Sequence, residues 1–129
     1  MRVQRISWLG TRTDRFDETT GFFRDVLGLE LVQEQPDFAM LRLPGADHDY
    51  VEVFGSGDPE TAFMATGPVA GLLVDDVIGA RAELEAAGVE LIGDIEWSQR
   101  IEGYGWFHFR GPDGNLYGVM QGSRAKAEP

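Results

Sequence analysis

The stretch Leu27-Gly28-Leu29-Glu30-Leu31 returns later in the chain as Ala87-Gly88-Val89-Glu90-Leu91. A second pair of segments follows in the same order, since residues 49–53 (DYVEV) are echoed by residues 115–119 (NLYGV). Repeats of this kind indicate two copies of one structural unit within the 129-residue chain. Each copy is typical of a strand, a helix and three further strands, which predicts an α+β fold made of two βαβββ modules in tandem.

In the first module, Gly28 stands where a helix ends in a left-handed residue, and Asp14 or Asp17 is expected to cap the start of that helix. The helix carries apolar residues at helical spacing, namely Phe22, Phe23, Val26 and Leu27. Apolar and β-branched runs separated by turns predict four strands, over Val3–Thr13, Leu29–Gln35, Phe38–Leu43 and Asp49–Phe54.

The second module repeats this order, with a helix that Asp75 or Asp76 caps and Gly88 ends. Its strands are predicted over Val69–Val74, Val89–Glu96, Tyr104–Arg110 and Leu116–Gln121. We therefore expect a single domain over residues 1–129, divided into module 1 (about 1–55), a connector (55–68), module 2 (about 69–121) and a frayed tail (122–129).

One helix covers only one face of the sheet in each module, so the other face is left open. Two modules side by side would form a curved mixed sheet whose open face is a cleft. Because ligand sites are concave, we expect function to lie there.

The composition excludes several classes of function. The chain has no cysteine and two histidines, His48 and His108, which rules out disulfides, thiolate metal sites and any site with three histidines. Its net charge of −11 argues against nucleic acid as a partner. It also has no long apolar run and no signal-peptide pattern at its start, which predicts a cytoplasmic protein that does not engage a membrane.

Three segments resemble signatures of the vicinal oxygen chelate superfamily, which includes glyoxalases, bleomycin-resistance proteins and extradiol dioxygenases. Residues 22–29 (FFRDVLGL) resemble its first helix, and Val74-Asp75-Asp76-Val77 with Ala87-Gly88-Val89 resembles its second. Gly111-Pro112-Asp113-Gly114-Asn115 is similar to the turn before its last strand, with Gly111 in place of an aspartate. The resemblance covers nearly the whole chain and implies the glyoxalase/bleomycin-resistance fold.

Metalloenzymes of that superfamily hold one divalent ion through four strands. By resemblance their ligand positions fall on Ser7 (or Trp8, if the count shifts by one), Glu52, Val69 and Gly118. Valine and glycine side chains donate nothing, and a protonated indole nitrogen does not coordinate a metal. We therefore predict no metal ligands and no cofactor, with a divalent metal as the less favoured alternative.

Strand alternation extends the candidate site around Glu52. The residues expected to line the cleft and bind a ligand are Ser7, Leu9, Tyr50, Glu52, Phe54, Val69, Gly71, Trp106, His108, Gly118 and Met120. Trp106 and His108 are assigned to the cleft because Phe107 and Phe109, on the other face of their strand, make the better core. Glycines at positions 71 and 118 indicate either room for a flat ligand or a bend in the sheet.

The favoured hypothesis is a metal-independent protein that binds a small planar or cationic aromatic molecule, similar to bleomycin-resistance proteins that sequester a drug, and so linked to antibiotic resistance. Aromatic walls beside one carboxylate suit such a ligand. The first alternative is a lyase, isomerase or dioxygenase with a degenerate site, in which Glu52 is the catalytic base and acts with His108 or an atypical metal. The second is an interaction domain with a vestigial cleft. The resemblance also implies a homodimer.

Overall fold

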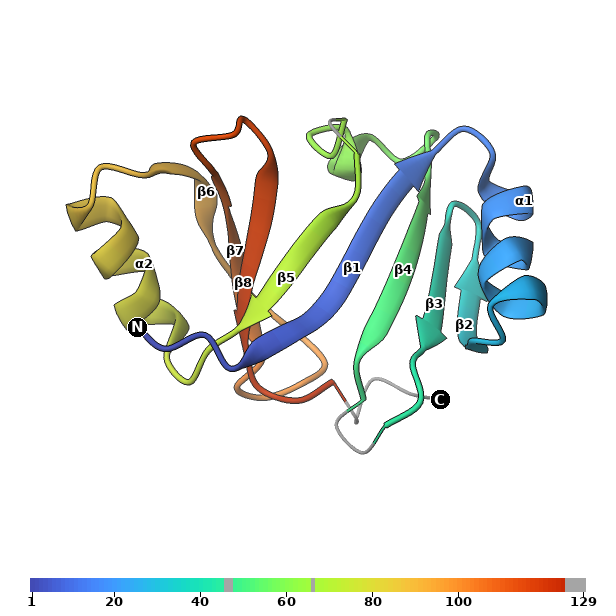
Figure 1. Ribbon diagram of the computed structural model, residues 1–129, viewed down its shortest axis with the longest axis horizontal. Coiled ribbons are helices and arrows are strands. Elements are labelled where there is room, and N and C mark those ends of the chain that lie inside the picture. Colours follow the sequence, from blue (N-terminus) through green and yellow to red (C-terminus); the bar gives the residue numbers. More distant parts are fainter. Residues whose placement is uncertain (46–47, 66, 125–129) are drawn as a thin grey trace.

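The computed structural model describes residues 1–45, 48–65 and 67–124. Eight strands form one mixed sheet in the order β2-β3-β4-β1-β5-β8-β7-β6, and the two modules meet at the antiparallel β1–β5 pair. The strands are β1 (Arg5–Thr13), β2 (Glu30–Gln35), β3 (Phe38–Arg42), β4 (Tyr50–Gly55), β5 (Val69–Leu73), β6 (Glu90–Trp97), β7 (Gly105–Arg110) and β8 (Leu116–Gln121). The predicted α+β fold of two βαβββ modules is confirmed (Figure 1).

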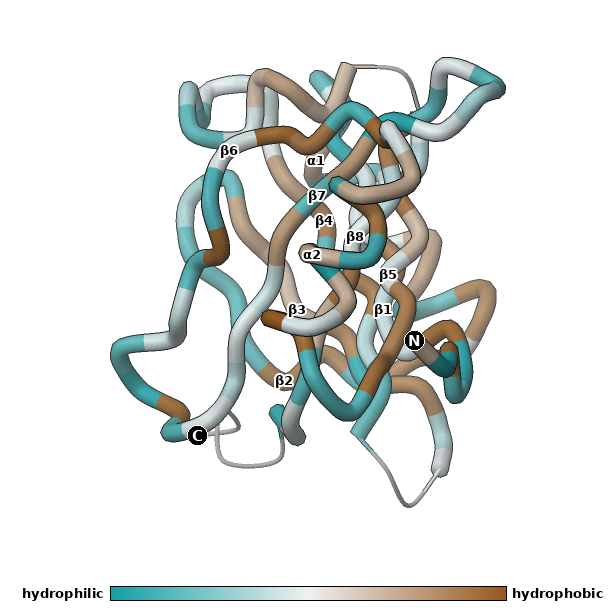
Figure 2. Tube along the Cα trace, turned by 90° about the vertical axis from the view of Figure 1, so that its left-hand side faces the viewer, coloured by the Kyte–Doolittle hydropathy of each residue, from teal (hydrophilic) through white to brown (hydrophobic). Residues whose placement is uncertain are grey.

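The sheet is strongly curved, and α1 (Phe16–Gly21) and α2 (Val77–Ala86) lie on its outside, at opposite ends of the molecule (Figure 1). Seen from the side of α2, the central strands β1 and β5 lie to one side of the view and β6 to the other (Figure 2). Neither helix in the described part of the chain has the length and apolar character needed to cross a bilayer.

Two small cores fix the helices to the outer face of the sheet. Under α2, Val77 and Ala80 pack against Phe107 and Val119. In the other module, Phe23 and its neighbours pack against the buried residues Ala39, Leu41 and Val53. Strand alternation thus sends Phe107 outward and its neighbours Trp106 and His108 to the opposite face, in agreement with the sequence.

The first helix differs from its prediction. It runs as an α-helix only to Gly21 and then widens into a π-helical turn, η1 (Phe22–Val26). No side chain caps its start at Arg15, so the predicted cap by Asp14 or Asp17 is wrong. The wider turn changes the register of the apolar residues, and Phe22, Val26 and Leu27 are at least half exposed.

The second helix follows its prediction closely. Asp76 has an extended backbone and its carboxylate accepts a hydrogen bond from the amide of Gly79 at 3.1 Å. The predicted cap is therefore Asp76 and not Asp75. The only other short helix in the described residues, η2 (Pro59–Thr61), lies in the connector between the modules.

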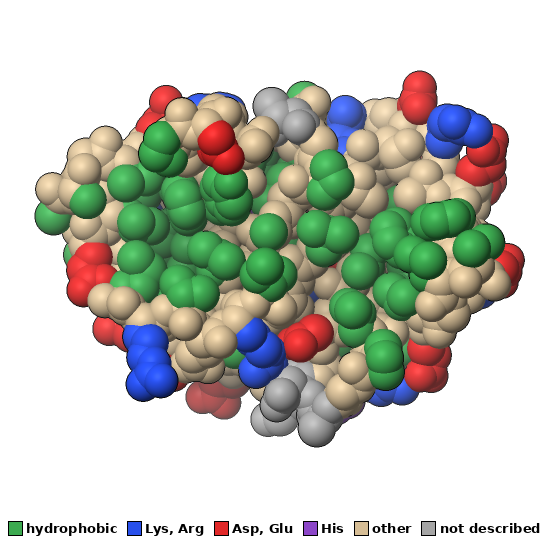
Figure 3. All heavy atoms as spheres, viewed as in Figure 1, with side chains coloured by type: hydrophobic (Ala, Val, Ile, Leu, Met, Phe, Trp, Pro, Cys, Tyr) green, Lys and Arg blue, Asp and Glu red, His purple; other side chains and the backbone are tan. Residues whose placement is uncertain are grey.

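Hydrophobic side chains gather over the face on which β1 and β5 lie nearest the viewer, between the two helices (Figure 3). Large hydrophobic residues on β1 and α2 are well exposed, with Ile6 at 63% and Ile78 at 61%. The homodimer that the resemblance implies would need such a surface. The homodimer stays a prediction.

Phe107→Ala should destabilise the protein because Phe107 is only 1% exposed and fills the space between β7 and α2. Truncating a buried phenylalanine costs about 3–5 kcal/mol of the free energy of unfolding. Ile78→Ala, on the exposed side of the same helix, is the matched control and should change it by about 0.5 kcal/mol or less. Urea denaturation of both variants tests this, and equal effects would contradict the assigned faces.

Candidate functional site

The inner face, meaning the face of the sheet opposite the helices, carries most of the predicted site. Cross-strand register places Tyr50, Glu52 and Phe54 of β4 on one side of β1, and Val69 and Gly71 of β5 on the other. Gly71 is level with Gly118 of β8, which pairs with His108 of β7, while Met120 pairs with Trp106. Nine of the predicted ligand-binding residues therefore share this face: Tyr50, Glu52, Phe54, Val69, Gly71, Trp106, His108, Gly118 and Met120.

The two predictions on β1 are wrong, because a bulge shifts the count by one. Ile6 pairs with Leu72 and Trp8 with Gly71, so Ser7 is an extra residue without a partner in β5. Trp8 and Gly10 then occupy the inner face, level with Tyr50 and Glu52. Leu9 pairs with Val51 and Ala70 on the outer face. The alternative prediction, in which Trp8 occupies the first ligand position, agrees with this register.

Trp8 lies across the sheet and binds Glu52. Its indole Nε1–H donates to Oε1 of Glu52 at 2.7 Å, and both residues are buried, at 8% and 5% exposure. Gly10 makes this arrangement possible, since a Cβ at that position would stand 2.2 Å from Cη2 of the indole. The ring therefore occupies the space that any other residue at position 10 would fill.

Arg124 supplies the second partner of Glu52, and sequence reasoning missed it. Its Nη2 donates to Oε2 of Glu52 at 2.9 Å, so both carboxylate oxygens are engaged. The guanidinium carbon also lies 5.3 Å from the ring centroid of Tyr50 and 5.6 Å from that of Tyr104, both within cation–π range. Arg124 belongs to the tail that was predicted to be frayed, but it is held by these contacts. Residues 125–129 lie outside the described part of the chain.

The surroundings of the site favour the charged form of Arg124 and the neutral form of the Tyr104 phenol. Burial alone would lower the pKa of Arg124, but the charge and hydrogen bond of Glu52 outweigh it and raise that pKa above its ordinary value. Burial raises the pKa of the Tyr104 phenol to about 12. At neutral pH the site thus holds a permanent planar cation against neutral aromatic rings and one carboxylate.

The expected open cleft is in fact filled by side chains. Trp8, Met64, Ile101, Tyr104 and Met120 form one buried cluster on the inner face, each 8% exposed or less. Met64 comes from the connector and Ile101 from the segment before β7, so these segments cover the sheet. The room predicted over Gly71 is taken by Met120, whose Sδ would lie 2.7 Å from a Cβ at that position.

His108 lies beside this cluster, in contact with the connector. Its ring centroid is 5.0 Å from that of Phe63 in an edge-on arrangement, and its imidazole atoms border Gly118. Burial lowers the pKa of His108 from 6.5 to about 4, so the imidazole is neutral at pH 7. Trp106 packs against Tyr104, with ring centroids 5.7 Å apart.

The inner face does not fit a divalent metal ion. Of the four positions at which the superfamily places ligands, Trp8 presents an N–H donor, while Val69 and Gly118 present no donor atom. The fourth, Glu52, already accepts from an indole and a guanidinium. Nowhere in residues 1–45, 48–65 and 67–124 do three His, Asp or Glu side chains gather as a metal site requires.

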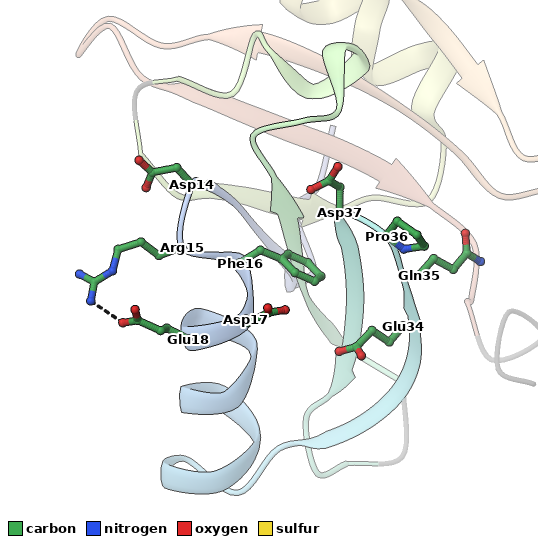
Figure 4. A pocket seen from close by; sticks show the side chains of 9 residues that line it. All are labelled: Asp14, Arg15, Phe16, Asp17, Glu18, Glu34, Gln35, Pro36 and Asp37. Atoms are coloured by element: carbon green, nitrogen blue, oxygen red, sulfur yellow. Dashed lines mark hydrogen bonds and ion pairs between the residues drawn. The ribbon is translucent and has the colours of Figure 1, made fainter.

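A separate hollow of about 770 Å³ lies away from the inner face, between the start of α1 and the turn from β2 to β3 (Figure 4). It contains none of the predicted site residues and is mostly acidic. Its lining is Asp14, Arg15, Phe16, Asp17, Glu18, Glu34, Gln35, Pro36 and Asp37, with Arg15 paired to Glu18. A row of carboxylates on the surface is ordinary in a chain of net charge −11 and defines no chemistry.

Residues 5–119 match the model of the Glyoxalase/Bleomycin resistance protein/Dioxygenase superfamily. The chain belongs to this superfamily. The sequence has no significant match among curated proteins.

Solved structures of this superfamily share the fold. A Mn(II)-bound glyoxalase from Novosphingobium aromaticivorans is 30% identical with a TM-score of 0.74, over 93% of this chain and 39% of that one, so the present chain spans well under half of that protein. A superfamily member from Vibrio splendidus 12B01 is 24% identical (TM-score 0.69, 92% of this chain and 98% of that one). Methylmalonyl-CoA epimerase from Mycobacterium tuberculosis is 18% identical (TM-score 0.71, 94% and 89%).

Gly10→Ala should expel the Trp8 indole from Glu52, because the new methyl group would overlap the ring. We expect a loss of about 1–3 kcal/mol in the free energy of unfolding and a changed Trp8 indole N–H signal in NMR spectra. Gly21→Ala, where a Cβ meets its nearest atoms at 3.8 Å, is the matched control and should leave that signal in place. An unchanged signal in Gly10→Ala would contradict the described hydrogen bond.

His108 should make the protein less stable as the pH falls from about 6.5 towards 4. Its folded pKa of about 4 lies below the ordinary value, so in this range the unfolded chain binds a proton that the folded protein does not. The full effect is about 3 kcal/mol. Urea titrations at pH 7 and pH 4.5 should show a smaller acid loss in His108→Gln than in the wild type. Parallel pH profiles would show that the imidazole titrates normally.

Proposed function

We propose that this protein binds a small planar cationic molecule at Glu52, on the inner face of the sheet, without a metal ion. One observation carries the proposal: the buried Glu52 carboxylate is surrounded by aromatic rings and is already paired with a planar cation of the chain, the guanidinium of Arg124. A carboxylate and ring faces together attract a flat cation by charge and by cation–π contact.

The aromatic surroundings make this more than a surface ion pair. Trp8 and Phe54 have ring centroids 6.4 Å apart, and Phe38 lies 5.7 Å from Phe54. With Tyr50, Tyr104 and Trp106 they line the inner face of both modules. Trp8, Tyr50 and Tyr104 are each 8% exposed or less, so a ligand reaches these rings only by displacing a side chain that now covers them. In such a partly dry setting, a charge pair is worth more than the same pair in water. The site therefore suits a ligand with an aromatic body and one positive charge.

Catalysis is the weaker hypothesis because the proton-transfer groups are poorly placed for it. A general base has to reach a substrate proton, but Glu52 is 5% exposed and each of its oxygens already accepts a hydrogen bond within the protein. His108, the remaining candidate, is a neutral imidazole in contact with Phe63. The metal-bound glyoxalase and the epimerases share the fold of this chain, and function is carried by site residues.

Thermal melts of EDTA-treated protein test the proposal directly. We expect no shift with nickel, zinc, manganese, iron(II) or magnesium, because the residues at three of the four ligand positions have no atom that coordinates a metal ion. N-methylquinolinium, a flat and permanently charged probe, should raise the Tm, since a ligand at a hundredfold excess over its Kd adds about 2.7 kcal/mol of stability. Neutral quinoline, at a pH where it is uncharged, should have a much smaller effect.

Glu52→Gln should abolish the response to N-methylquinolinium, because it removes the charge and keeps the shape of the side chain. Glu34→Gln, an exposed carboxylate on β2, is the matched control and should respond like the wild type. A metal-induced rise in Tm that disappears in Glu52→Gln would overturn the metal-independent proposal and favour the enzyme hypothesis.

A further inference from the structure

Arg124 occupies the position at Glu52 that a cationic ligand would need. Its Nη2 donates to Oε2 at 2.9 Å, and its guanidinium carbon lies over the rings of Tyr50 and Tyr104. Its side chain is 18% exposed and that of Glu52 is 7% exposed, so the pair is largely withdrawn from water. The protein thus carries on its own chain a group with the charge, shape and donors of a ligand.

The path of the chain explains how Arg124 reaches this position. β8 ends at Gln121, whose side chain accepts from the amide of Val77 and donates to the carbonyl of Gly103. Gly122 then turns the chain with φ +93°, and a Cβ there would lie 2.9 Å from the oxygen of Gly103. The ladder of β7 and β8 ends at Gln121, so moving Arg124 away from Glu52 leaves that ladder intact. The move gives up the contact in which the Tyr50 hydroxyl donates to the Arg124 carbonyl at 3.5 Å.

The contacts of Arg124 define which cations can take its place. Oε1 of Glu52 is held by the Trp8 indole, so a newcomer meets mainly Oε2, where an N–H donor adds a hydrogen bond to the attraction between charges. The ring faces of Tyr50 and Tyr104 favour a flat, delocalised cation over a compact ammonium group. A quaternary ammonium satisfies the charge but offers no hydrogen bond to Oε2.

We infer that the ligand of this site carries a guanidinium or amidinium group, and that it binds by replacing Arg124 at Glu52. This inference rests on the proposed function and deepens it, because it names the cation and makes Arg124 a resident competitor. A ligand then binds only to the fraction of molecules in which Arg124 has left Glu52, and its apparent affinity is reduced by that fraction.

The test measures phenylguanidine binding by calorimetry to wild type, Arg124→Ala and Arg124→Gln. Both variants should bind phenylguanidine at least about tenfold more tightly than the wild type, because the competitor is gone. The gain should disappear in the double variant Arg124→Ala/Glu52→Gln. Arg24→Ala removes an exposed arginine paired with Asp25 and is the matched control, expected to bind like the wild type.

A second probe and an NMR readout separate the outcomes. Phenyltrimethylammonium, which has no N–H donor, should gain less than phenylguanidine from the loss of Arg124. The Trp8 indole N–H signal, assigned with Trp8→Phe, should shift when phenylguanidine binds, which locates it at Glu52. Two arginine variants are used so that a folding defect in one does not decide the result.

Equal or weaker phenylguanidine binding by both folded arginine variants would overturn the inference, because Arg124 would then support the site and not compete for it. If N-methylquinolinium still bound in a Glu52-dependent manner, the proposed function would survive that result. If no cation bound to any variant, the proposed function itself would fail.

Discussion

A carboxylate buried in the inner face of a sheet has to be compensated, and much of this structure is arranged around that requirement at Glu52. Removing a charge from water is costly unless hydrogen bonds and an opposite charge replace the solvent. The indole of Trp8 satisfies one oxygen and the guanidinium of Arg124 the other. Gly10 leaves space for the indole, and Gly122 turns the last described segment towards the pair. The positions of Trp8 and Arg124, which lie near opposite ends of the chain, thus both depend on the charge of Glu52.

The two modules share the same order of elements but differ in the side chains that they place at equivalent positions of the site. Gly10 pairs with Glu52 in the first module as Gly71 pairs with Gly118 in the second, so equivalent positions hold a carboxylate in one and no side chain in the other. Met120 fills the space over Gly71, as Trp8 does over Gly10. The first half of the site is therefore polar and charged, whereas the second is apolar. Such asymmetry suits a ligand with one charged end and an aromatic body.

Sequence reasoning succeeded where local patterns decide the structure. The repeat gave the two modules, and strand alternation separated Trp106 from Phe107 correctly. It failed at Ser7 and Leu9, because a bulge depends on pairing with β5 and leaves no mark in the local pattern. It also missed Arg124, which is an ordinary tail residue until the fold brings Glu52 beside it. The available signal was Arg124 just after the last predicted strand, together with Glu52, a carboxylate predicted to face the cleft, where it needs a partner.

The pairing of Glu52 with Arg124 also bears on how selective such a site is. A ligand gains only the difference between its own contacts and those that Arg124 already makes, so charge alone brings little advantage. What distinguishes a ligand is the contact that it makes beyond those of Arg124, since Tyr50 and Tyr104 are already buried, at 1% and 7% exposure. Under the proposed function, a resident cation discriminates against small ions and simple amines, and it keeps the buried carboxylate paired between binding events. Of the four positions that the resemblance assigns to a metal ion, only Glu52 carries a coordinating side chain, and Arg124 is its charged partner.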